Sequence, residues 1–370
     1  MAKIMIIATG AMMVYHHRLE LITRLRLCGM DVIVAAPEAP EAAKLRELGC
    51  RFIDTPLDTR GKNLLKDLDL CHRLIRTIRR EQPDAVLTFY TKTNIYGAIA
   101  AQWEGVPYIT NITGMGSAIE NGGLMQRVML ILYRLAVRKA SCLFFQNQYN
   151  LDFFASHNIR RGSGRLIPGS GVSLERFHPL PYPQEDLKPE FVFISRILKE
   201  KGIDQYIDAA KDITKNYPGT VFHVIGPCGK DYADILDSLD KNGTIRYHGK
   251  QFDVRPYIER SHCVVFPSYY SEGMANVLLE GAACGRPLIT TGRPGCGETV
   301  DDGITGYVVK ERDSQDLIDK IERFIALPLE EKRKMGEAGR RKMEREFDRE
   351  IIVNAYMEEI NRLLLSGNRY

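Results

Sequence analysis

The cysteines of this 370-residue chain lack the spacings that are typical of disulfide or metal-binding motifs. Eight are present, yet none forms a C-x-x-C pair or a Cys/His cluster at the spacing of a zinc site. Such a distribution is typical of buried thiols in a reducing compartment, so we expect neither disulfides nor structural zinc. Low-complexity segments and short internal repeats are also missing, which argues against a disordered chain or a solenoid.

Long hydrophobic runs are missing as well. The apolar run within Met1–His17 is short and has no small-residue cleavage site, so it predicts a first buried strand rather than a signal peptide. The run Val128–Val137 is interrupted by Arg134 and is far shorter than the ~20 residues that cross a bilayer. We therefore expect a cytoplasmic protein without a transmembrane span.

The length predicts two domains, because one hydrophobic core rarely grows beyond about 250–300 residues. In both halves, strand-like runs alternate with helical stretches, which is typical of doubly wound parallel sheets in the α/β class. The predicted strands are Lys3–Ala8, Asp31–Ala36, Ala85–Phe89, Tyr108–Ile112, Cys142–Gln146, Phe191–Ile194, Val221–Ile225, Ile245–His248, Cys263–Pro267 and Pro287–Thr290.

The two halves are separated by Phe177–Glu190, where four prolines and few periodic apolar residues indicate a linker. We predict an N-terminal domain over 1–177, a linker over 178–190 and a C-terminal domain over 191–347. A last helix over 348–370 is expected to pack back on the N-terminal domain. Two Rossmann-like domains of this kind bind ligands at the carboxyl ends of their strands, here in a central cleft that both domains face.

Positive charge is concentrated in the first half. Residues 1–180 carry 23 Lys and Arg against 15 Asp and Glu, whereas the remainder carries 28 against 32. The charge collects on predicted helices, including Arg18, Arg24 and Arg26 on the first. In Leu124–Lys139 arginines stand among many apolar residues, which suits an amphipathic helix on a membrane surface or a core-packed helix with a basic outer face. Aromatic residues do not alternate with these charges, so nucleic acid is not an expected partner.

The segment Phe266–Pro287 sets two carboxylates around a glycine and a predicted helix start. Gly273 permits the positive φ that lets main chain approach a ligand, and the first amides of a helix stabilise a phosphate. Glu280 lies under two turns along the helix, within reach of a ribose diol, whereas Glu272 suits hydrogen bonds from hexose hydroxyls. The pattern indicates a sugar-nucleotide donor. The helix would open with Met274, Ala275, Asn276 and Val277.

Two cations follow the predicted strand Phe191–Ile194. Arg196 suits a forked contact with diphosphate oxygens, and Lys201 adds a point charge. Together they would neutralise a leaving nucleoside diphosphate without a metal, so no divalent metal is expected. A surface ion pair with Glu200 is the alternative.

The series SRILKEKGI, VIGPCGKDY, YHGKQFDV, FPSYYSEGMANVLLEGAACGRPLITT and GETVDDGITGYVV resembles the donor domain of the retaining glycosyltransferases of family 4, which have the two-domain GT-B fold. The resemblance covers about residues 190–310. It implies sugar transfer with retention and without a divalent metal, by front-face attack in which the leaving phosphate accepts the acceptor's proton.

The resemblance also implies roles for single residues. Arg196, Lys201 and Glu272 would be the catalytic residues, with Arg196 and Lys201 on the diphosphate and Glu272 on the donor sugar. The amides of 274–277 would bind phosphate, Glu280 would bind the ribose, and Gly226 with 251–254 would flank the base.

A narrower resemblance involves residues 88–117 and 294–300, which are similar to a branch of this family that builds bacterial surface glycans. That branch includes enzymes that add N-acetylgalactosamine to undecaprenyl-diphosphate-linked bacillosamine. It implies an N-acetylhexosamine from a UDP-sugar donor, a polyprenyl-diphosphate-linked acceptor, and a peripheral location on the inner face of the plasma membrane.

The loop after Tyr108–Ile112 offers close backbone approach and hydroxyl groups, which suits a place under the donor or a plain strand-to-helix turn. Its candidate residues are Thr113, Gly114, Gly116 and Ser117. The sequence departs from the family at two positions. A histidine expected near this loop is absent, so its role is vacant or is filled by Asn111, Thr113 or another residue. Gly297 stands where the branch often has arginine.

Histidines 16 and 17 stand early in the first βα unit. His16 and His17 would face the acceptor, where His16 suits an acceptor hydroxyl or a lipid phosphate. A lone histidine in a loop is, however, more often structural or solvated.

Other chemistries have weaker support. Asp67-Leu68-Asp69 matches the D-x-D metal motif of the other glycosyltransferase fold, but its basic helical context predicts a solvated face. A G-x-x-x-x-G-K-[ST] loop and a strand-linked G-x-G-x-x-G in the first βα unit are both absent. Two alternatives remain: a UDP-sugar 2-epimerase of the same fold, and a non-catalytic partner in a glycan assembly complex.

Overall fold

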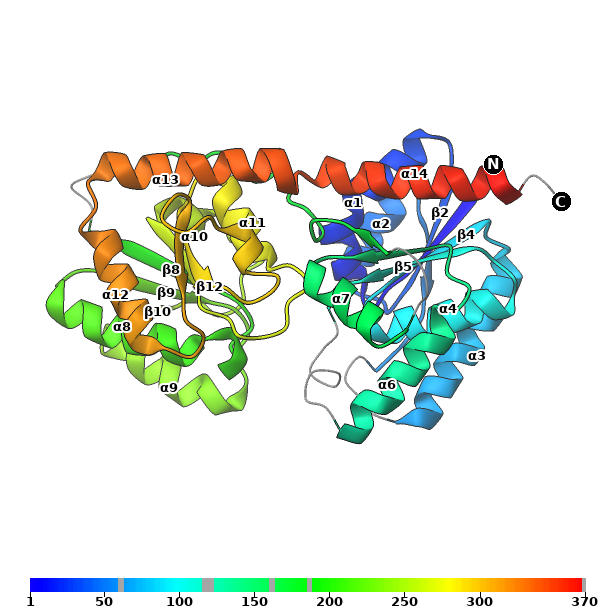
Figure 1. The fold of residues 1–370 in the computed structure, drawn as a ribbon, viewed down its shortest axis with the longest axis horizontal. Helices are drawn as coiled ribbons and strands as arrows, with labels where there is room; N and C mark the ends of the chain where they lie inside the picture. Colours follow the sequence, from blue (N-terminus) through cyan, green and yellow to red (C-terminus); the bar gives the residue numbers. More distant parts are fainter. Residues whose placement is uncertain (59–62, 115–122, 160–163, 185–187, 368–370) are drawn as a thin grey trace. The chain divides into compact units, whose positions relative to one another are not determined.

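The chain forms two compact units (Figure 1). The computed structural model describes residues 1–370 except 59–62, 115–122, 160–163, 185–187 and 368–370. Unit 1 comprises Met1–Gly171 and Arg349–Tyr370, and unit 2 comprises Val172–Asp348. Each unit is built on one parallel sheet, so the predicted α/β class with two doubly wound domains is confirmed.

Unit 1 contains a seven-stranded sheet in the order β3-β2-β1-β4-β5-β6-β7, and all its pairs are parallel. Strand β1 lies between β2 and β4, with Ile4 opposite Val32 on one side and Ala85 on the other. The strands are β1 (Lys3–Ile7), β2 (Asp31–Ala36), β3 (Arg51–Asp54), β4 (Ala85–Phe89), β5 (Tyr108–Ile112), β6 (Cys142–Phe145) and β7 (Arg165–Leu166).

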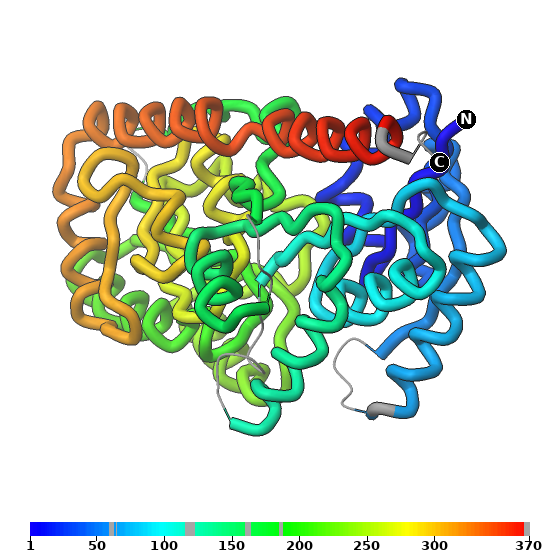
Figure 2. The backbone as a smooth tube through the Cα atoms, turned by 45° about the vertical axis from the view of Figure 1, so that its right-hand side comes forward, coloured from blue at the N-terminus to red at the C-terminus, as the bar shows by residue number. Residues whose placement is uncertain are grey.

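Helices cover both faces of this sheet, which is why its central strands are continuously apolar. Ile4 and Ile6 point to the face covered by α1 (Ala11–Leu27), α2 (Glu41–Glu47) and α14 (Arg349–Gly367). Met5 and Ile7 point to the opposite face. The helices there are α3 (Leu64–Glu81), α4 (Thr91–Trp103), α6 (Gly123–Ala136) and α7 (Gln148–Ser156). Figure 2 shows α14, in red, beside the dark-blue N-terminal elements of the same unit.

Unit 2 contains a six-stranded parallel sheet in the order β10-β9-β8-β11-β12-β13. Its strands are β8 (Glu190–Ile194), β9 (Val221–Ile225), β10 (Arg246–Tyr247), β11 (Cys263–Phe266), β12 (Leu288–Thr291) and β13 (Gly306–Val309). Its α-helices are α8 (Ile203–Asn216), α9 (Lys230–Lys241), α10 (Arg255–Arg260), α11 (Asn276–Ala283), α12 (Ser314–Ile325) and α13 (Leu329–Lys342). Short turns are 3-10 helices η1 (Lys199–Lys201) and η2 (Gly297–Thr299), and the π-helical turn η3 (Met343–Phe347).

The segment before β8 is fixed to unit 2 by Arg286, which is fully buried. The guanidinium donates five hydrogen bonds of 2.6 to 3.2 Å, all to backbone carbonyls. Two of these carbonyls, of Leu180 and Pro181, belong to the predicted linker. The acceptors are Leu180, Pro181, Ile258, Glu259 and Cys284.

Asp67 does not lie on a solvated face, so that part of the sequence prediction is wrong. Its carboxylate is mostly buried, accepting from Nζ of Lys92 at 2.7 Å and from the hydroxyl of Tyr96 at 3.2 Å. Both partners come from α4, which packs along α3.

Across the described helices, none combines the length and the apolar composition needed to cross a membrane.

Candidate active site

In unit 2 the chain leaves the sheet in opposite directions from two neighbouring strands. Strand β8 continues to β9 on one side, and β11 continues to β12 on the other. At such a switch point the carboxyl ends of the strands leave room for a ligand. The residues that follow these two ends include Arg196, Lys201 and Glu272, which the sequence analysis proposed as catalytic.

The loops after β8 and β11 are packed directly against each other. Gly202 has a φ of +82°, and a Cβ there would lie 2.2 Å from the Pro267 carbonyl oxygen. The Tyr269 amide donates to the Glu200 carbonyl at 2.9 Å. Glycine is therefore required at 202, because no side chain fits where the two loops meet. This contact brings Lys201 and Glu272 together.

Lys201 and Glu272 form an ion pair in which Nζ donates to Oε1. The ammonium also lies over the Tyr270 ring, 4.3 Å from its centroid. Lys201 is only 6% exposed, so water screens this pair less than it screens a surface ion pair. Arg196, in contrast, is exposed and forms no ion pair with the described residues. Two of the three predicted catalytic side chains therefore meet.

Helix α11 begins at Asn276, two residues later than predicted. The Ala275 amide donates to the Gly295 carbonyl at 2.8 Å, so this amide, one of four expected at a phosphate, is already bonded. The amides of Asn276 and Val277 have no acceptor within the helix, and the first turn carries no acidic residue. The helix start keeps the partial positive charge that attracts a phosphate. Met274 and Gly273, just before it, are buried.

Two further donor-side candidates of unit 2 lie on α11 and after β9. Glu280 is half-buried, four residues beyond the first residue of α11. Gly226 has a φ of +144°, and a Cβ there would lie 1.7 Å from the Ser195 carbonyl oxygen. Only glycine therefore lets the loop after β9 pass beside the turn that carries Arg196.

A third loop, after β12, supports Glu272, a role that the sequence did not indicate. Gly295 has a φ of +85°, and a Cβ there would lie 2.8 Å from the Glu272 Cβ and carbonyl oxygen. Oε2 of Glu298 accepts the Gly295 amide at 2.7 Å. Burial raises the pKa of the Cys296 thiol well above its usual range, so it is neutral beside Glu272. The two glycines in 295–298 were the sequence feature that could have indicated a close contact between this loop and Glu272. Gly297 opens η2 in the same loop.

The acceptor-side candidates are in unit 1, and so are the donor-side candidates Gly114 and Gly116. His16 and His17 are part of α1. Both are half-buried, and their carbonyls accept from Arg349 and Arg18. Thr113 and Gly114 follow β5, and Gly114 has a φ of +138°. Gly116 and Ser117 lie outside the described residues.

Asn111, proposed as a replacement for the family's histidine, is fully buried. Its Nδ2 donates to the Tyr356 hydroxyl of α14, and its carbonyl accepts from Nδ2 of Asn94 at 2.7 Å. It therefore ties α14 to the sheet and does not face a sugar.

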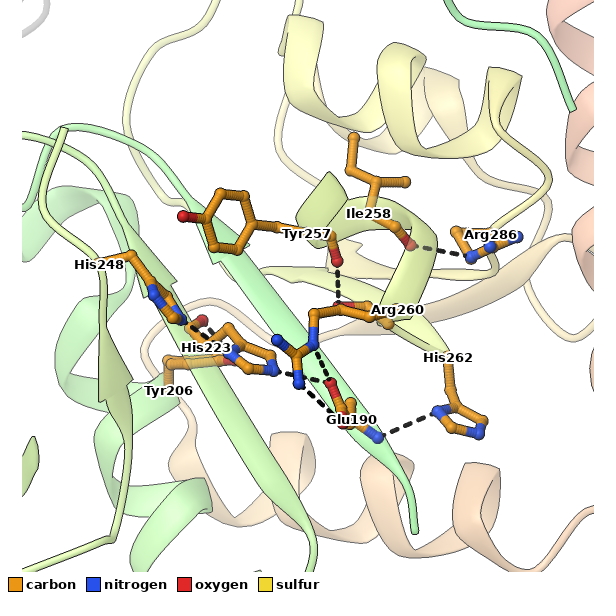
Figure 3. Close-up of polar contacts among 10 residues, drawn as sticks. Glu190, Tyr206, His223, His248, Tyr257, Ile258, Arg260, His262 and Arg286 are labelled. Carbon is orange, nitrogen blue, oxygen red and sulfur yellow. Dashed lines mark hydrogen bonds and ion pairs between the residues drawn. The ribbon is translucent and has the colours of Figure 1, made fainter. Parts of the chain in front are cut away.

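Histidines also cluster at the amino end of β8, away from the loops just described (Figure 3). Nε2 of His223 lies 2.8 Å from Glu190, and its Nδ1 lies 2.9 Å from Nε2 of His248. Arg260 donates to the same carboxylate at 2.8 Å, and Nδ1 of His262 accepts the Glu190 amide at 3.1 Å. The ring nitrogens in these contacts are already hydrogen-bonded, so the cluster is structural. The described residues include no group of side chains suited to a metal ion.

Two doubly wound parallel α/β units in one chain are the architecture of the GT-B fold. Residues 181–342 match the model for glycosyl transferases group 1, and residues 16–169 match the glycosyl transferase 4-like domain. The chain belongs to the family 4 glycosyltransferases, as the sequence motifs indicated.

Relatives of known activity align over most of the chain. The N,N'-diacetylbacillosaminyl-diphospho-undecaprenol alpha-1,3-N-acetylgalactosaminyltransferase of Campylobacter jejuni is 25% identical, over 95% of this chain and 96% of its own. The UDP-Gal:alpha-D-GlcNAc-diphosphoundecaprenol alpha-1,3-galactosyltransferase of Escherichia coli is 25% identical over 79% of both. Anabaena Alr3699/HepE, crystallised with UDP and glucose, gives a TM-score of 0.79 at 16% identity, covering 98% of this chain and 100% of its own. That last likeness shows the fold.

Proposed function

We propose that this protein is a retaining glycosyltransferase that moves an N-acetylhexosamine from a UDP-sugar to a polyprenyl-diphosphate-linked glycan. The observation that carries the proposal is the buried Lys201–Glu272 pair beside the start of α11. An ammonium and helix amides suit a diphosphate, and a carboxylate suits sugar hydroxyls. The carboxyl end of the sheet in unit 2 thus offers groups that suit the diphosphate and the sugar of such a donor.

In the proposed reaction, an acceptor hydroxyl oxygen bonds to the anomeric carbon of the donor sugar while the bond from that carbon to the donor phosphate breaks. The acceptor's proton passes to the leaving phosphate. Lys201 and the amides of Asn276 and Val277 stabilise the negative charge that grows on the diphosphate, with Arg196 as a further cation at the rim. These groups take the place of a divalent metal. Glu272 orients the sugar, and Glu280 binds the ribose.

The identities of donor and acceptor rest on relatives. The names of the Campylobacter jejuni and Escherichia coli relatives specify undecaprenyl-linked diphosphate substrates, and the second specifies a UDP-sugar. The first name also specifies N-acetylgalactosamine, and that relative aligns with nearly the whole chain. These names favour a UDP-N-acetylhexosamine and a lipid diphosphate for this chain.

A lipid-linked acceptor requires work at a membrane surface, and α6 offers a suitable face. Its exposed apolar residues recur at helical spacing, and exposed cations flank them. Apolar side chains would enter the lipid boundary while the cations meet anionic headgroups. We therefore place the protein on the inner face of the plasma membrane, docked through α6. The apolar residues are Leu124, Val128, Ile131 and Leu135, and the cations are Arg127, Arg134, Arg138 and Lys139.

A panel of UDP-sugars, each with a polyprenyl-diphosphate disaccharide, tests the proposal by mass spectrometry. We expect one sugar to be added with release of UDP, and nuclear magnetic resonance of the product to show the donor's anomeric configuration. An isomerised UDP-sugar without acceptor would instead identify an epimerase. Failure to bind any UDP-sugar in calorimetry would favour a non-catalytic partner.

A further inference from the structure

Arg18 is a buried cation in the core of unit 1. It lies on the side of α1 that faces the sheet, between Val14 and Leu21, and is 3% exposed. Its guanidinium carbon is 4.4 Å from the centroid of the Phe89 ring, at the last residue of β4. Arginine stays protonated in proteins, so a full positive charge lies beneath the carboxyl end of this strand.

This charge has almost no hydrogen-bond partners. Nη1 donates to the His17 carbonyl at 2.8 Å, but Nε and Nη2 are buried and have no acceptor among the described residues. No carboxylate in that part of the chain pairs with Arg18. Burial raises the pKa of Tyr90 and of Tyr356, the ionisable neighbours, to about 12, so neither hydroxyl carries a compensating charge at neutral pH.

Two other buried arginines have more partners, although Nε of Arg349 also has no acceptor among the described residues. Arg286 donates to five carbonyls, and Arg349 pairs with Glu20 at 2.8 Å and bonds two carbonyls. A cation over an aromatic ring regains about 2 kcal/mol when desolvated, whereas burying an ion without its partner costs several. Arg18 therefore lowers the stability of unit 1 in the absence of an anion.

The position of Arg18 is the ligand-binding position of a doubly wound sheet. Strand β1 continues to β2, its neighbour β4 continues to β5 on the opposite side, and α1 and α4 begin at these two strand ends. Neither helix has an acidic residue in its first turn or a side-chain cap. Tyr90, between β4 and α4, has a φ of +72° and ψ of 156°, a region that costs other residues than glycine about 1–3 kcal/mol.

We propose that Arg18 supplies the positive charge of a phosphate-binding site at the β1/β4 switch point of unit 1. The first amides of α1 and α4 contact the phosphate, and Arg18 acts as a positioning residue from below, because its unpartnered nitrogens are covered. The ligand is a phosphate or diphosphate group. In the proposed function, two substrates contain such a group: the lipid-linked acceptor and the UDP-sugar donor. The phosphate site itself does not depend on the proposed function, and only the choice between these two substrates does.

Inorganic pyrophosphate is the probe, used on protein saturated with UDP so that the donor edge of unit 2 is occupied. We expect calorimetry to detect pyrophosphate binding to this form of the wild type, and hydrogen exchange to slow at the starts of α1 and α4. Arg18→Met should weaken this binding at least tenfold while the melting temperature stays equal or rises. Arg26→Gln, an exposed arginine of the same helix, is the control and should change the affinity less than twofold.

Further measurements distinguish the two sources. A raised KM for the lipid acceptor with unchanged UDP-sugar affinity in Arg18→Met identifies the acceptor's diphosphate. A weaker UDP-sugar affinity with unchanged acceptor KM identifies the donor's. The pyrophosphate measurement requires no transfer reaction, so its result tests the phosphate site independently of the proposed activity.

Two results would overturn the proposal: no pyrophosphate binding by the UDP-saturated wild type, or an Arg18→Met variant that loses stability while its pyrophosphate affinity stays within twofold. Arg18→Gln replaces Arg18→Met if the latter does not fold. If neither variant folds, hydrogen exchange of the wild type with and without pyrophosphate tests the proposal. Slowed exchange at both helix starts then supports the site, and its absence overturns it.

Discussion

Arg18 of unit 1 is held differently from two buried cations of unit 2, Lys201 and Arg286. In unit 2, Lys201 is paired with Glu272, and Arg286 donates to five carbonyls. In unit 1, Arg18 has one carbonyl partner. A cation paired within the fold is positioned before a ligand arrives, whereas an unpaired one gains its partner from the ligand. On the two proposals above, unit 2 has a preformed binding edge and unit 1 has a charge that an anion completes.

The largest expected effect is on the stability of unit 2. Arg286→Met removes five hydrogen bonds to buried carbonyls and a buried charge, and only the carbonyls of Ile258 and Cys284 keep a backbone donor among the described residues, so we expect the free energy of unfolding to fall by about 3–5 kcal/mol. Urea unfolding, followed by circular dichroism, measures the change. Arg333→Met removes an exposed arginine of α13 and should alter stability by about 0.5 kcal/mol or less. A loss below about 1 kcal/mol in Arg286→Met would mean that the carbonyls are not the reason for this buried charge.

The next effect concerns the paired carboxylate of unit 2. Glu272→Gln removes the negative charge from the reacting sugar and from Lys201, so kcat should fall about 100-fold while the affinity for UDP changes by about threefold or less. Steady-state transfer assays and calorimetry separate the two quantities. Glu311→Gln, an exposed carboxylate of the same unit, is the control. An unchanged kcat would remove Glu272 from the reaction.

Acid should destabilise unit 2 through the cluster in Figure 3. Burial lowers the pKa of His262 to about 4, below its ordinary value of 6.5. The resulting stability, about 3 kcal/mol, is fully present above pH 6.5 and is lost as the pH falls towards 4. The pKa of Glu190, lowered to about 2 by hydrogen bonds to His223 and Arg260 that outweigh its burial, adds a loss below pH 4.5.

Hydrogen exchange at pH 7, 5.5 and 4.5 measures this dependence within each unit. We expect β8 and β9 to lose protection before β1 and β4 do. His262→Gln should flatten the loss between pH 6.5 and 4. Equal loss in this variant and the wild type would assign the acid sensitivity to other groups.

The smallest effect concerns the proposed membrane face of unit 1. The double variant Arg134→Gln/Arg138→Gln removes two cations, each contributing about 1 kcal/mol near an anionic surface, so vesicle binding should weaken about tenfold or more at low salt. Ile131→Ser should weaken binding to the same vesicles through lost apolar contact. Leu27→Ser, an exposed leucine of α1 in the same unit, is the control. Sedimentation with phosphatidylserine vesicles gives the result, and unchanged binding would favour a basic helix face without a lipid partner.

Most of the fold was predictable because buried parallel strands are continuously apolar. The bounds of β2, β4, β5 and β9 agree with the predicted ones. Strands β3, β7 and β13 were not predicted as strands. Strand β7 has two residues and β3 has exposed ends, so neither has a distinct apolar pattern.

Tertiary contacts account for the remaining errors. Asp67 occurs in a helix with several basic residues, whose composition predicts a solvated face, and nothing in the sequence indicated that Arg18 is buried. Packing of α4 covers Asp67, and packing against Phe89 covers Arg18. The motifs of the donor domain identified Lys201 and Glu272. They did not indicate that the Ala275 amide donates to the Gly295 carbonyl. This hydrogen bond joins two loops that are distant in the sequence and come together only in the folded chain.

The central claim is that the paired cation of unit 2 holds a nucleoside diphosphate, and titration calorimetry with UDP tests it most directly. Lys201→Ala should bind UDP at least about tenfold more weakly than the wild type, because it removes a buried charge-assisted contact. Lys199→Ala, two residues away and exposed, should bind UDP about as tightly as the wild type does. Equal UDP affinity in Lys201→Ala and the wild type would contradict the claim.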